Sequence, residues 1–191
     1  MKKDSQIAII GAGIVGLAIA YKLSQQGHLV NVFEKEAELG MHQSGRNSGV
    51  LHCGLYYQPG SLKANLSVNG IREMIAFCEE YQLPYDQCGK VVVATNDNEI
   101  QALDTLAARG EKNGLLGLRY LSNEQLKKRE PFVRAHKALL VPEEGIVDYK
   151  AVMRKMVQKI KENGGDIYYN TPISWIKERD NSTLQIQTKE I

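Results

Sequence analysis

The sequence is short of the features that mark several classes of protein. Its three cysteines, Cys53, Cys78 and Cys88, form neither a CxxC pair nor a zinc-binding spacing. We therefore expect no metal site, and reduced thiols as in a cytoplasmic protein. Charge of one sign is lacking too, because 24 basic and 22 acidic side chains leave a net charge of +2. With no basic cluster and only 7% aromatic residues, nucleic acid is not an expected partner.

A long hydrophobic run is also missing. The most apolar stretch, Ile7 to Ala20, contains three glycines and is too short to cross a bilayer. It lacks the charged start and the small-residue cleavage site of a secretion signal. We expect a cytoplasmic location, with peripheral contact at the inner face of the membrane as the other location considered.

A β-α-β pattern opens the chain and indicates an α/β fold. Ile7 to Ile10 is predicted to be a buried strand, Ile14 to Gln26 a helix that Gly27 ends, and Leu29 to Glu34 a second strand. Such crossovers between parallel strands are nearly always right-handed. The predicted apolar face of the helix consists of Val15, Leu17, Ile19, Ala20 and Leu23. Near the other end of the chain, Asp148 is predicted to cap a helix, and residues 173–177 and 184–188 are predicted to form a hairpin around a turn at residues 180–182.

The predicted turn between the first strand and the helix carries a dinucleotide fingerprint. Gly11-Ala12-Gly13-Ile14-Val15-Gly16 fits G-x-G-x-x-G. Gly11 permits a tight turn, Gly13 lets the backbone approach a pyrophosphate, and Gly16 allows close packing of helix on strand. The helix N-terminus at Ile14 and Val15 offers N–H groups and partial positive charge to the anion. Glu34 ends the second strand, where its carboxylate can accept hydrogen bonds from a ribose diol, which disfavours the 2′-phosphate of NADP.

The fingerprint alone leaves NAD and FAD open, and the following loop favours FAD. Gly40 to Gly60 is rich in glycine, serine and asparagine and lacks a regular period, as functional loops do. The run from Glu34 to Gly49, with Ser44-Gly45-Arg46-Asn47-Ser48-Gly49 at its end, resembles the D-amino-acid-oxidase superfamily of FAD enzymes. The resemblance implies FAD as the cofactor, with further contacts from Lys35, His42, Ser44, Asn47, Ser48, Gly49 and Ile173. A role in ordering the loop is the alternative for His42, and plain sheet pairing is the equal alternative for Ile173.

A longer stretch resembles one family within that superfamily. Residues 42–64, Glu130-Pro131 and residues 142–148 resemble the L-2-hydroxyglutarate dehydrogenases and oxidases. The resemblance implies oxidation of L-2-hydroxyglutarate to 2-oxoglutarate with reduction of FAD, and then electron transfer to oxygen, a quinone or another flavoprotein. The chain departs from the family at Arg46, where some members have histidine. It also has about half of the family's length, so we expect it to be truncated.

That chemistry needs a base for the alcohol proton and cationic or hydroxyl donors for a dianionic substrate. His52 is the candidate base, with a hydrogen-bonded role in the loop as the equal alternative. The substrate-binding candidates are Arg46, Tyr56, Tyr57 and Lys63. Tyr56 and Tyr57 are adjacent, so only one is expected to reach a pocket, and the simpler interpretation of Lys63 is a solvated lysine.

The predicted architecture is a Rossmann-like FAD/NAD(P)-binding layer with part of a mixed-sheet substrate domain. Residues 1–80 and 146–191 are assigned to a discontinuous, incomplete FAD-binding domain, and residues 81–145 to the substrate domain. We expect an exposed sheet edge or apolar face, and marginal stability. Two other functions stay open: a superfamily enzyme that oxidises glycerol 3-phosphate or an amino acid, and an inactive truncated fragment that binds FAD.

Overall fold

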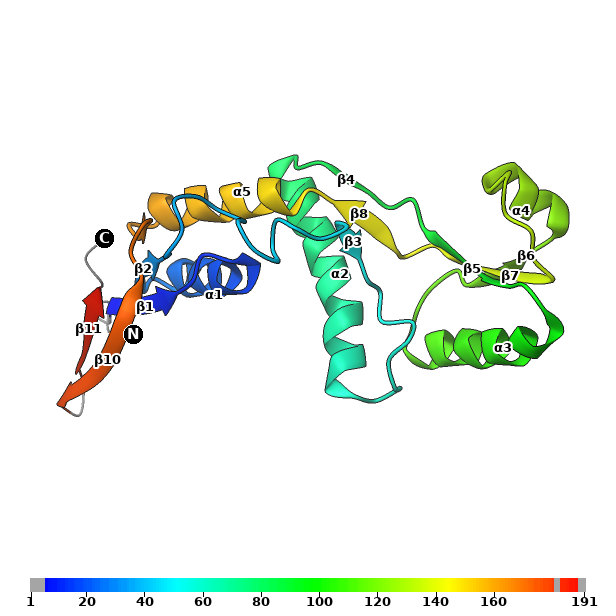
Figure 1. Cartoon of the computed structure of the whole chain (residues 1–191), viewed down its shortest axis with the longest axis horizontal. Helices are drawn as coiled ribbons and strands as arrows, with labels where there is room; N and C mark the ends of the chain where they lie inside the picture. Colours follow the sequence, from blue (N-terminus) through cyan, green and yellow to red (C-terminus); the bar gives the residue numbers. More distant parts are fainter. Residues whose placement is uncertain (1–5, 181–182, 189–191) are drawn as a thin grey trace. The chain divides into compact units, whose positions relative to one another are not determined.

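The computed structural model describes residues 6–180 and 183–188 and has the predicted α/β fold (Figure 1). The described chain forms two compact units. One contains the residues up to Asn47 and those from Asp148 onward; the other contains Ser48–Val147. The N-terminal β-α-β therefore belongs to the same unit as the C-terminal helix and strands.

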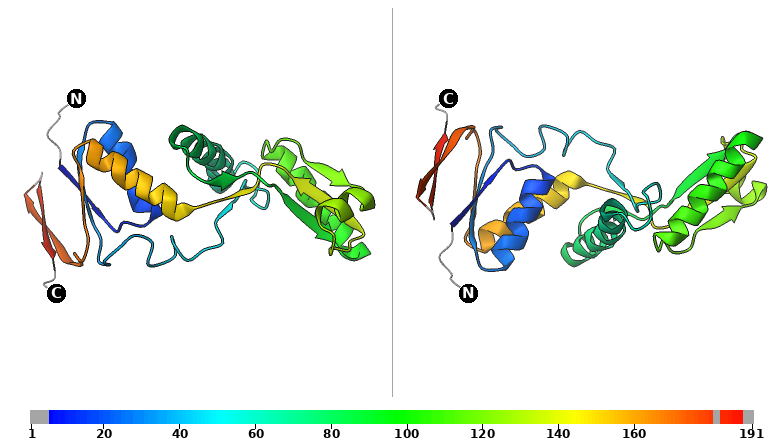
Figure 2. Two further views of the ribbon diagram at one scale, coloured as in Figure 1. Left: turned by 90° about the horizontal axis from the view of Figure 1, so that it is seen from above. Right: turned by 90° about the horizontal axis from the view of Figure 1, so that it is seen from below.

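A parallel sheet organises the first unit. Its strand order is β1-β2-β9, with β1 at Gln6–Ile10, β2 at Leu29–Phe33 and β9 at Asp166–Tyr168. Helices α1 (Ile14–Gln25) and α5 (Tyr149–Glu162) lie side by side (Figure 2). Their buried residues are Leu17, Ala20, Tyr21 and Ser24 of α1, and Val152, Met153, Met156 and Ile160 of α5.

The predicted helix ends of this unit are confirmed. The Asp148 carboxylate accepts hydrogen bonds from the backbone N–H groups of Lys150 and Ala151, so it caps α5. Gly27 follows α1 with a φ of +86°, a conformation that favours glycine. The predicted hairpin is also present as β10 (Ile173–Asp180) and β11 (Thr183–Thr188), which pair antiparallel; residues 181 and 182 of its predicted turn lie outside the described residues.

Two predictions about burial were wrong. The first strand was expected to be buried, yet Ile10 is 52% exposed because β1 is the last strand of its sheet among the described residues. Val15 and Ile19 were expected on the apolar face of α1, yet they are 70% and 48% exposed. Of the predicted face only Leu17 and Ala20 are buried, together with Tyr21 and Ser24, which were not predicted to be part of it.

The second unit contains two antiparallel sheets, with strand orders β3-β8-β4 and β5-β7-β6. In the second of these sheets, β7 lies between β5 and β6 and runs antiparallel to both, so the described chain contains the antiparallel part of the predicted substrate-domain sheet. The elements are β3 (Val50–Leu51), α2 (Leu62–Tyr81), β4 (Tyr85–Asp86), β5 (Lys90–Ala94), α3 (Asp97–Lys112), β6 (Arg119–Leu121), α4 (Asn123–Arg129), β7 (Lys137–Val141) and β8 (Gly145–Val147).

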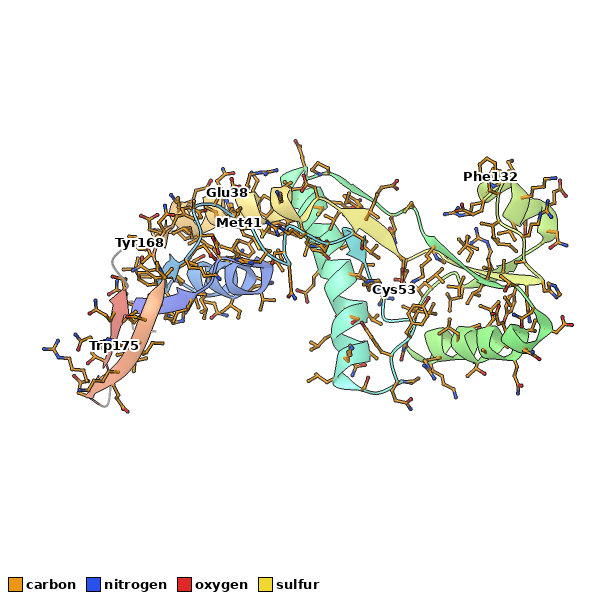
Figure 3. All side chains as sticks on the ribbon, in the orientation of Figure 1. Glu38, Met41, Cys53, Phe132, Tyr168 and Trp175 are labelled. Carbon is orange, nitrogen blue, oxygen red and sulfur yellow. The ribbon has the colours of Figure 1, made fainter. Side chains whose placement is uncertain are left out.

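Residues 48–80 pack into this second unit, whereas the predicted domain boundaries put them with the cofactor domain. Helix α2 begins at Leu62, where the Ser61 hydroxyl accepts a hydrogen bond from the Ala64 N–H, and it packs on the loop at Gly54. A compact packing unit is not the same thing as a cofactor-binding domain, so the predicted domain boundaries stay a prediction. Phe132, which follows α4, is 99% exposed and points away from the ribbon (Figure 3).

Candidate nucleotide site and catalytic loop

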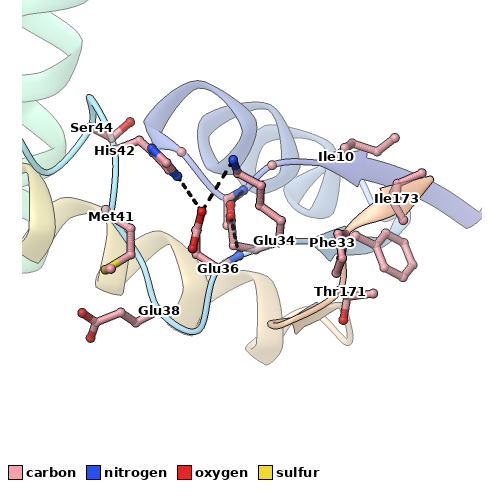
Figure 4. A pocket seen from close by; sticks show the side chains of 16 residues that line it. Ile10, Phe33, Glu34, Glu36, Glu38, Met41, His42, Ser44, Thr171 and Ile173 are labelled. Atoms are coloured by element: carbon pink, nitrogen blue, oxygen red, sulfur yellow. Dashed lines mark hydrogen bonds and ion pairs between the residues drawn. The ribbon is translucent and has the colours of Figure 1, made fainter. Parts of the chain in front are cut away.

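A cavity of about 370 Å³ lies in the first unit, where the carboxyl ends of β1 and β2 meet the start of α1 (Figure 4). Ligands of open α/β sheets bind outside this edge of the sheet. The lining residues come from the glycine turn, the end of β2, the following loop and the start of β10. They are Ile10, Gly11, Ala12, Gly13, Phe33, Glu34, Lys35, Glu36, Glu38, Gly40, Met41, His42, Ser44, Thr171, Pro172 and Ile173.

The glycine turn has the close packing that the fingerprint requires. Gly11 has a φ of +96°, and its N–H donates to the Phe33 carbonyl over 2.8 Å. A Cβ on Gly16 would lie 2.1 Å from the Gly11 carbonyl oxygen, which leaves no room for a side chain. Helix and turn are therefore in contact at Gly16, as predicted for the third glycine.

The first turn of α1 fits a diphosphate. Gly13 is the N-cap and makes no side-chain cap, and the first turn contains no acidic residue. The Ile14 N–H donates to the Ser44 hydroxyl over 3.0 Å, which places the loop serine beside the helix N-terminus. A Cβ on Gly13 would lie 3.1 Å from the same oxygen, so Ser44 would have to shift to admit a side chain at this position.

Glu34 holds its carboxylate against the glycine turn. Its Oε2 accepts from the Ala12 N–H at 2.7 Å, and its Oε1 accepts from the Glu36 N–H at 3.0 Å. The Glu34 backbone is fixed as well, because its N–H donates to Tyr168 and its carbonyl accepts from Thr171. Each carboxylate oxygen has a second lone pair, so both can still accept from a ribose diol.

The loop after β2 is fixed by an ion-pair cluster around Glu36. His42 Nε2 lies 2.7 Å from Glu36 Oε1, and Lys35 Nζ lies 3.5 Å from the same oxygen (Figure 4). The hydrogen bond from His42 and the charges of His42 and Lys35 hold the pKa of Glu36 below its ordinary value. His42 thus orders the loop through Glu36, one of the two roles that the sequence allowed.

The other predicted cofactor residues are spread over both units. The Asn47 amide donates to the carbonyls of Gln43 and Ser44, which tightens the loop. Ile173 lines the cavity at the start of β10, whereas the side chain of Arg46 is exposed to solvent. Ser48 and Gly49 begin the second unit, where Gly49 has a φ of +72° and its carbonyl accepts from the Val147 N–H.

In the second unit, His52 and Tyr56 lie next to one buried ion pair. His52 directly follows β3, is 59% exposed, and has its Nδ1 3.9 Å from Glu144 Oε1. Glu144 is only 2% exposed, and its Oε2 lies 2.8 Å from Lys90 Nζ. The same ammonium lies 4.6 Å from the ring centroid of Tyr56.

Tyr57 has a different partner from Tyr56, as expected for adjacent side chains that point to opposite sides. Lys63, in the first turn of α2, has its Nζ 4.3 Å from the Tyr57 ring centroid. Cys53 is buried next to His52, and burial together with the charge of Glu144 raises the pKa of its thiol to about 12. A thiol of this kind is a packing group.

Several residues of these sites were not predicted. Glu36, Phe33 and Met41 line the cavity, and only Glu36 had a usable signal, because it lies two residues after Glu34, the predicted ribose ligand. Lys90 and Glu144 had none, since they are far apart in the sequence. Within residues 6–180 and 183–188 no group of three or more His, Cys, Asp or Glu could hold a metal ion. No helix in this part of the chain is long and apolar enough to cross a membrane.

Fold and cavity together define a dinucleotide-binding α/β protein of the kind that flavoproteins use. The family model described as FAD dependent oxidoreductase (DAO) matches residues 6–190, and the chain belongs to this family. The family settles the choice that the fingerprint left open: the cofactor is FAD rather than NAD.

Two curated relatives are named as L-2-hydroxyglutarate dehydrogenases. The protein from Indibacter alkaliphilus is 42% identical over 95% of this chain, and the mitochondrial protein from Homo sapiens is 42% identical over 90%. The match covers 46% and 37% of these relatives, so the chain spans less than half of their length.

Solved structures show the same fold. The FAD-bound L-α-glycerophosphate oxidase from Mycoplasma pneumoniae superposes with a TM-score of 0.87, at 26% identity over 98% of this chain and 50% of that one. Glycine oxidase from Geobacillus kaustophilus superposes with a TM-score of 0.83 at 23% identity, over 95% of this chain and 50% of that one.

Proposed function

We propose that this chain forms the FAD-binding part and the base-bearing loop of an enzyme that oxidises L-2-hydroxyglutarate to 2-oxoglutarate. The observation that carries the proposal is the 42% identity to L-2-hydroxyglutarate dehydrogenases over 95% of the chain. The cavity at the glycine turn supports the cofactor part of it. There Glu34 would hold the ribose, and the first turn of α1 would hold the diphosphate.

The roles of the residues follow from the reaction. When bound, FAD supplies the acceptor for the hydride that leaves the α-carbon of the substrate. His52 takes the proton of the substrate hydroxyl, for which an exposed imidazole is suited. The proposed donors to the two substrate carboxylates are Arg46, Tyr56, Tyr57 and Lys63. Of these, Tyr56 has its ring next to Lys90, whose ammonium pairs with Glu144 beside His52.

Turnover by the flavin-loaded protein tests the proposal. L-2-hydroxyglutarate, its D-enantiomer, glycerol 3-phosphate and glycine are each supplied with an artificial electron acceptor. Reduction of the acceptor is measured for all four compounds, and 2-oxoglutarate is measured as the product of the two hydroxyglutarates. We expect product from the L-enantiomer alone. The variant His52→Asn is expected to bind FAD like the unmodified chain and to lose about 10²–10⁴-fold in rate, the usual contribution of a general base. Turnover of glycerol 3-phosphate instead would assign the other superfamily activity.

A second candidate is a module that binds FAD without turning over a substrate. The observation that favours it is length, because the chain spans 46% of its relative from Indibacter alkaliphilus. Full FAD binding without reduction by any of the four compounds would support it. Turnover of L-2-hydroxyglutarate would exclude it.

The electron acceptor and the location are also proposals. Oxygen, a quinone and another flavoprotein are the acceptor classes, and the proposed location is the cytoplasm or the inner face of the membrane. Dioxygen consumption and quinone reduction by the substrate-reduced protein distinguish the first two classes. Cell fractionation tests the location, and recovery only in the salt-washed membrane pellet would contradict a cytoplasmic protein.

A further inference from the structure

Glu144 is the only charged side chain in the buried class among residues 6–180 and 183–188. It stands in the turn between β7 and β8, where its backbone carbonyl accepts from the Gly89 N–H. Burying a carboxylate costs stability unless a neighbouring group compensates its charge. Its neighbours therefore indicate what it does.

The two oxygens of Glu144 face different groups. Oε2 lies 2.8 Å from Lys90 Nζ, which supplies the compensating charge. Oε1 receives the thiol of Cys53 at 3.5 Å and lies 3.9 Å from His52 Nδ1. Lys90 alone would be enough to balance the carboxylate, so the orientation of Oε1 toward the loop is not needed for charge balance.

We propose that Glu144 is a positioning residue that holds the His52 ring with Nδ1–H turned inward and Nε2 on the exposed side. A carboxylate behind one ring nitrogen selects the tautomer in which that nitrogen carries the proton. Nε2 is then the unprotonated nitrogen, as a base needs. The distance of 3.9 Å is longer than a hydrogen bond, but at this range the negative charge of a buried carboxylate still favours the tautomer that carries its proton on Nδ1. This inference rests on the proposed function only in taking His52 as the base.

The tautomer of His52 can be measured on this chain without FAD or substrate. Long-range ¹H–¹⁵N correlation spectra of protein with ¹⁵N-labelled histidine distinguish Nδ1–H from Nε2–H rings, at about pH 8, above the ordinary titration range of histidine. The spectrum of His52→Asn identifies the His52 signals among those of the four histidines. We expect His52 to be mainly the Nδ1–H tautomer, in contrast to a short histidine peptide measured alongside. A ring that is mainly Nε2–H overturns the proposal.

A double variant shows whether Glu144 is the cause. Lys90→Met with Glu144→Leu replaces the buried pair by apolar side chains of similar size, a change that folds often tolerate. In this variant we expect the His52 tautomer ratio to move to that of the peptide, while the backbone spectrum outside the cluster stays the same. An unchanged ratio contradicts the proposal. If the double variant does not fold, the tautomer of His52 in the unmodified chain alone tests the proposal.

The two proposals fail separately. An Nδ1–H ring in a protein that does not oxidise L-2-hydroxyglutarate would support the positioning role and remove the proposed substrate. Turnover of L-2-hydroxyglutarate with an Nε2–H ring would keep the function and remove the role of Glu144.

Discussion

At the residue scale, two helix glycines look alike in the sequence and differ in the structure. Gly16 in α1 and Gly70 in α2 both occupy helix interiors, where alanine is intrinsically preferred by roughly 0.5–1 kcal/mol. A Cβ at Gly16 would lie 2.1 Å from a backbone oxygen, whereas a Cβ at Gly70 would have nothing within 4 Å. A steric clash therefore determines the effect of an alanine at Gly16, whereas helix propensity determines the effect of an alanine at Gly70.

The variant Gly16→Ala is expected to lose about 1–3 kcal/mol of unfolding free energy, the usual cost of overpacking. It should also weaken FAD binding, because the glycine turn must shift. The matched variant Gly70→Ala should gain about 0.5–1 kcal/mol and bind FAD unchanged. Urea denaturation and FAD fluorescence quenching measure both effects. Equal changes in unfolding free energy and in FAD affinity for the two variants would contradict the close packing of Gly16 on the glycine turn.

The three cysteines provide a second prediction at this scale. The pKa of Cys53 is raised from 9.0 to about 12, which lowers its thiolate fraction at neutral pH by about a thousandfold. Cys78 is buried as well, whereas Cys88 is exposed. With Ellman's reagent at about pH 8 we expect one thiol, Cys88, to react rapidly, and the other two only after unfolding in guanidinium. Rapid labelling of Cys53 would show that the Glu144 cluster is open to solvent.

At the scale of elements, the ion-pair cluster around Glu36 makes the stability of the loop after β2 depend on pH. The pKa of Glu36 is lowered in the folded chain, chiefly by the His42 hydrogen bond. A lowered carboxyl pKa contributes stability that is present above the unfolded value of 4.5 and is lost as the pH falls through the folded value.

The difference in melting temperature between the unmodified chain and Glu36→Gln should therefore shrink as the pH falls below about 4.5, where the Glu36 carboxylate takes up a proton. Glu38→Gln is the matched control, because Glu38 lies in the same loop and has no ion pair with any described residue. A Glu36→Gln difference that grows toward acid pH would contradict the ion-pair cluster.

Local signals account for what the sequence predicted among the elements. The β-α-β unit, the Asp148 cap and the β10–β11 hairpin each depend on neighbouring residues, and all three were predicted. Helix α4 was missed although Ser122 and Gln125 form its capping box, a signal that is visible in the sequence. The antiparallel order β5-β7-β6 could not be predicted, because it depends on which distant strand inserts between two others.

The residues of the candidate site also fall into two groups, those with a local signal in the sequence and those without one. The glycines and Glu34 follow a fixed spacing within one supersecondary unit, so their roles could be assigned before the structure was known. The Glu144–Lys90 pair joins positions that are 54 residues apart, and nothing near either residue indicates that they meet. The exposure of Val15 and Ile19 was also beyond local reasoning, because it depends on which helix packs on α1.

At the scale of the whole molecule, the chain carries a family fold over less than half of its relatives' length. The described part contains a complete glycine turn to which Glu34 is hydrogen-bonded, and a loop whose histidine lies next to a buried ion pair. It also exposes the apolar side chains of Ile10, Val15 and Ile19. Marginal stability of the chain alone stays a prediction.

Reduction of the bound flavin by substrate is the measurement that tests the central claim most directly. The flavin-loaded protein is titrated anaerobically with L-2-hydroxyglutarate and, in parallel, with the D-enantiomer, while the visible absorption of the oxidised flavin is followed. We predict bleaching by the L-enantiomer and none by the D-enantiomer. A flavin that stays oxidised with L-2-hydroxyglutarate but bleaches with glycerol 3-phosphate or an amino acid would contradict the proposed function.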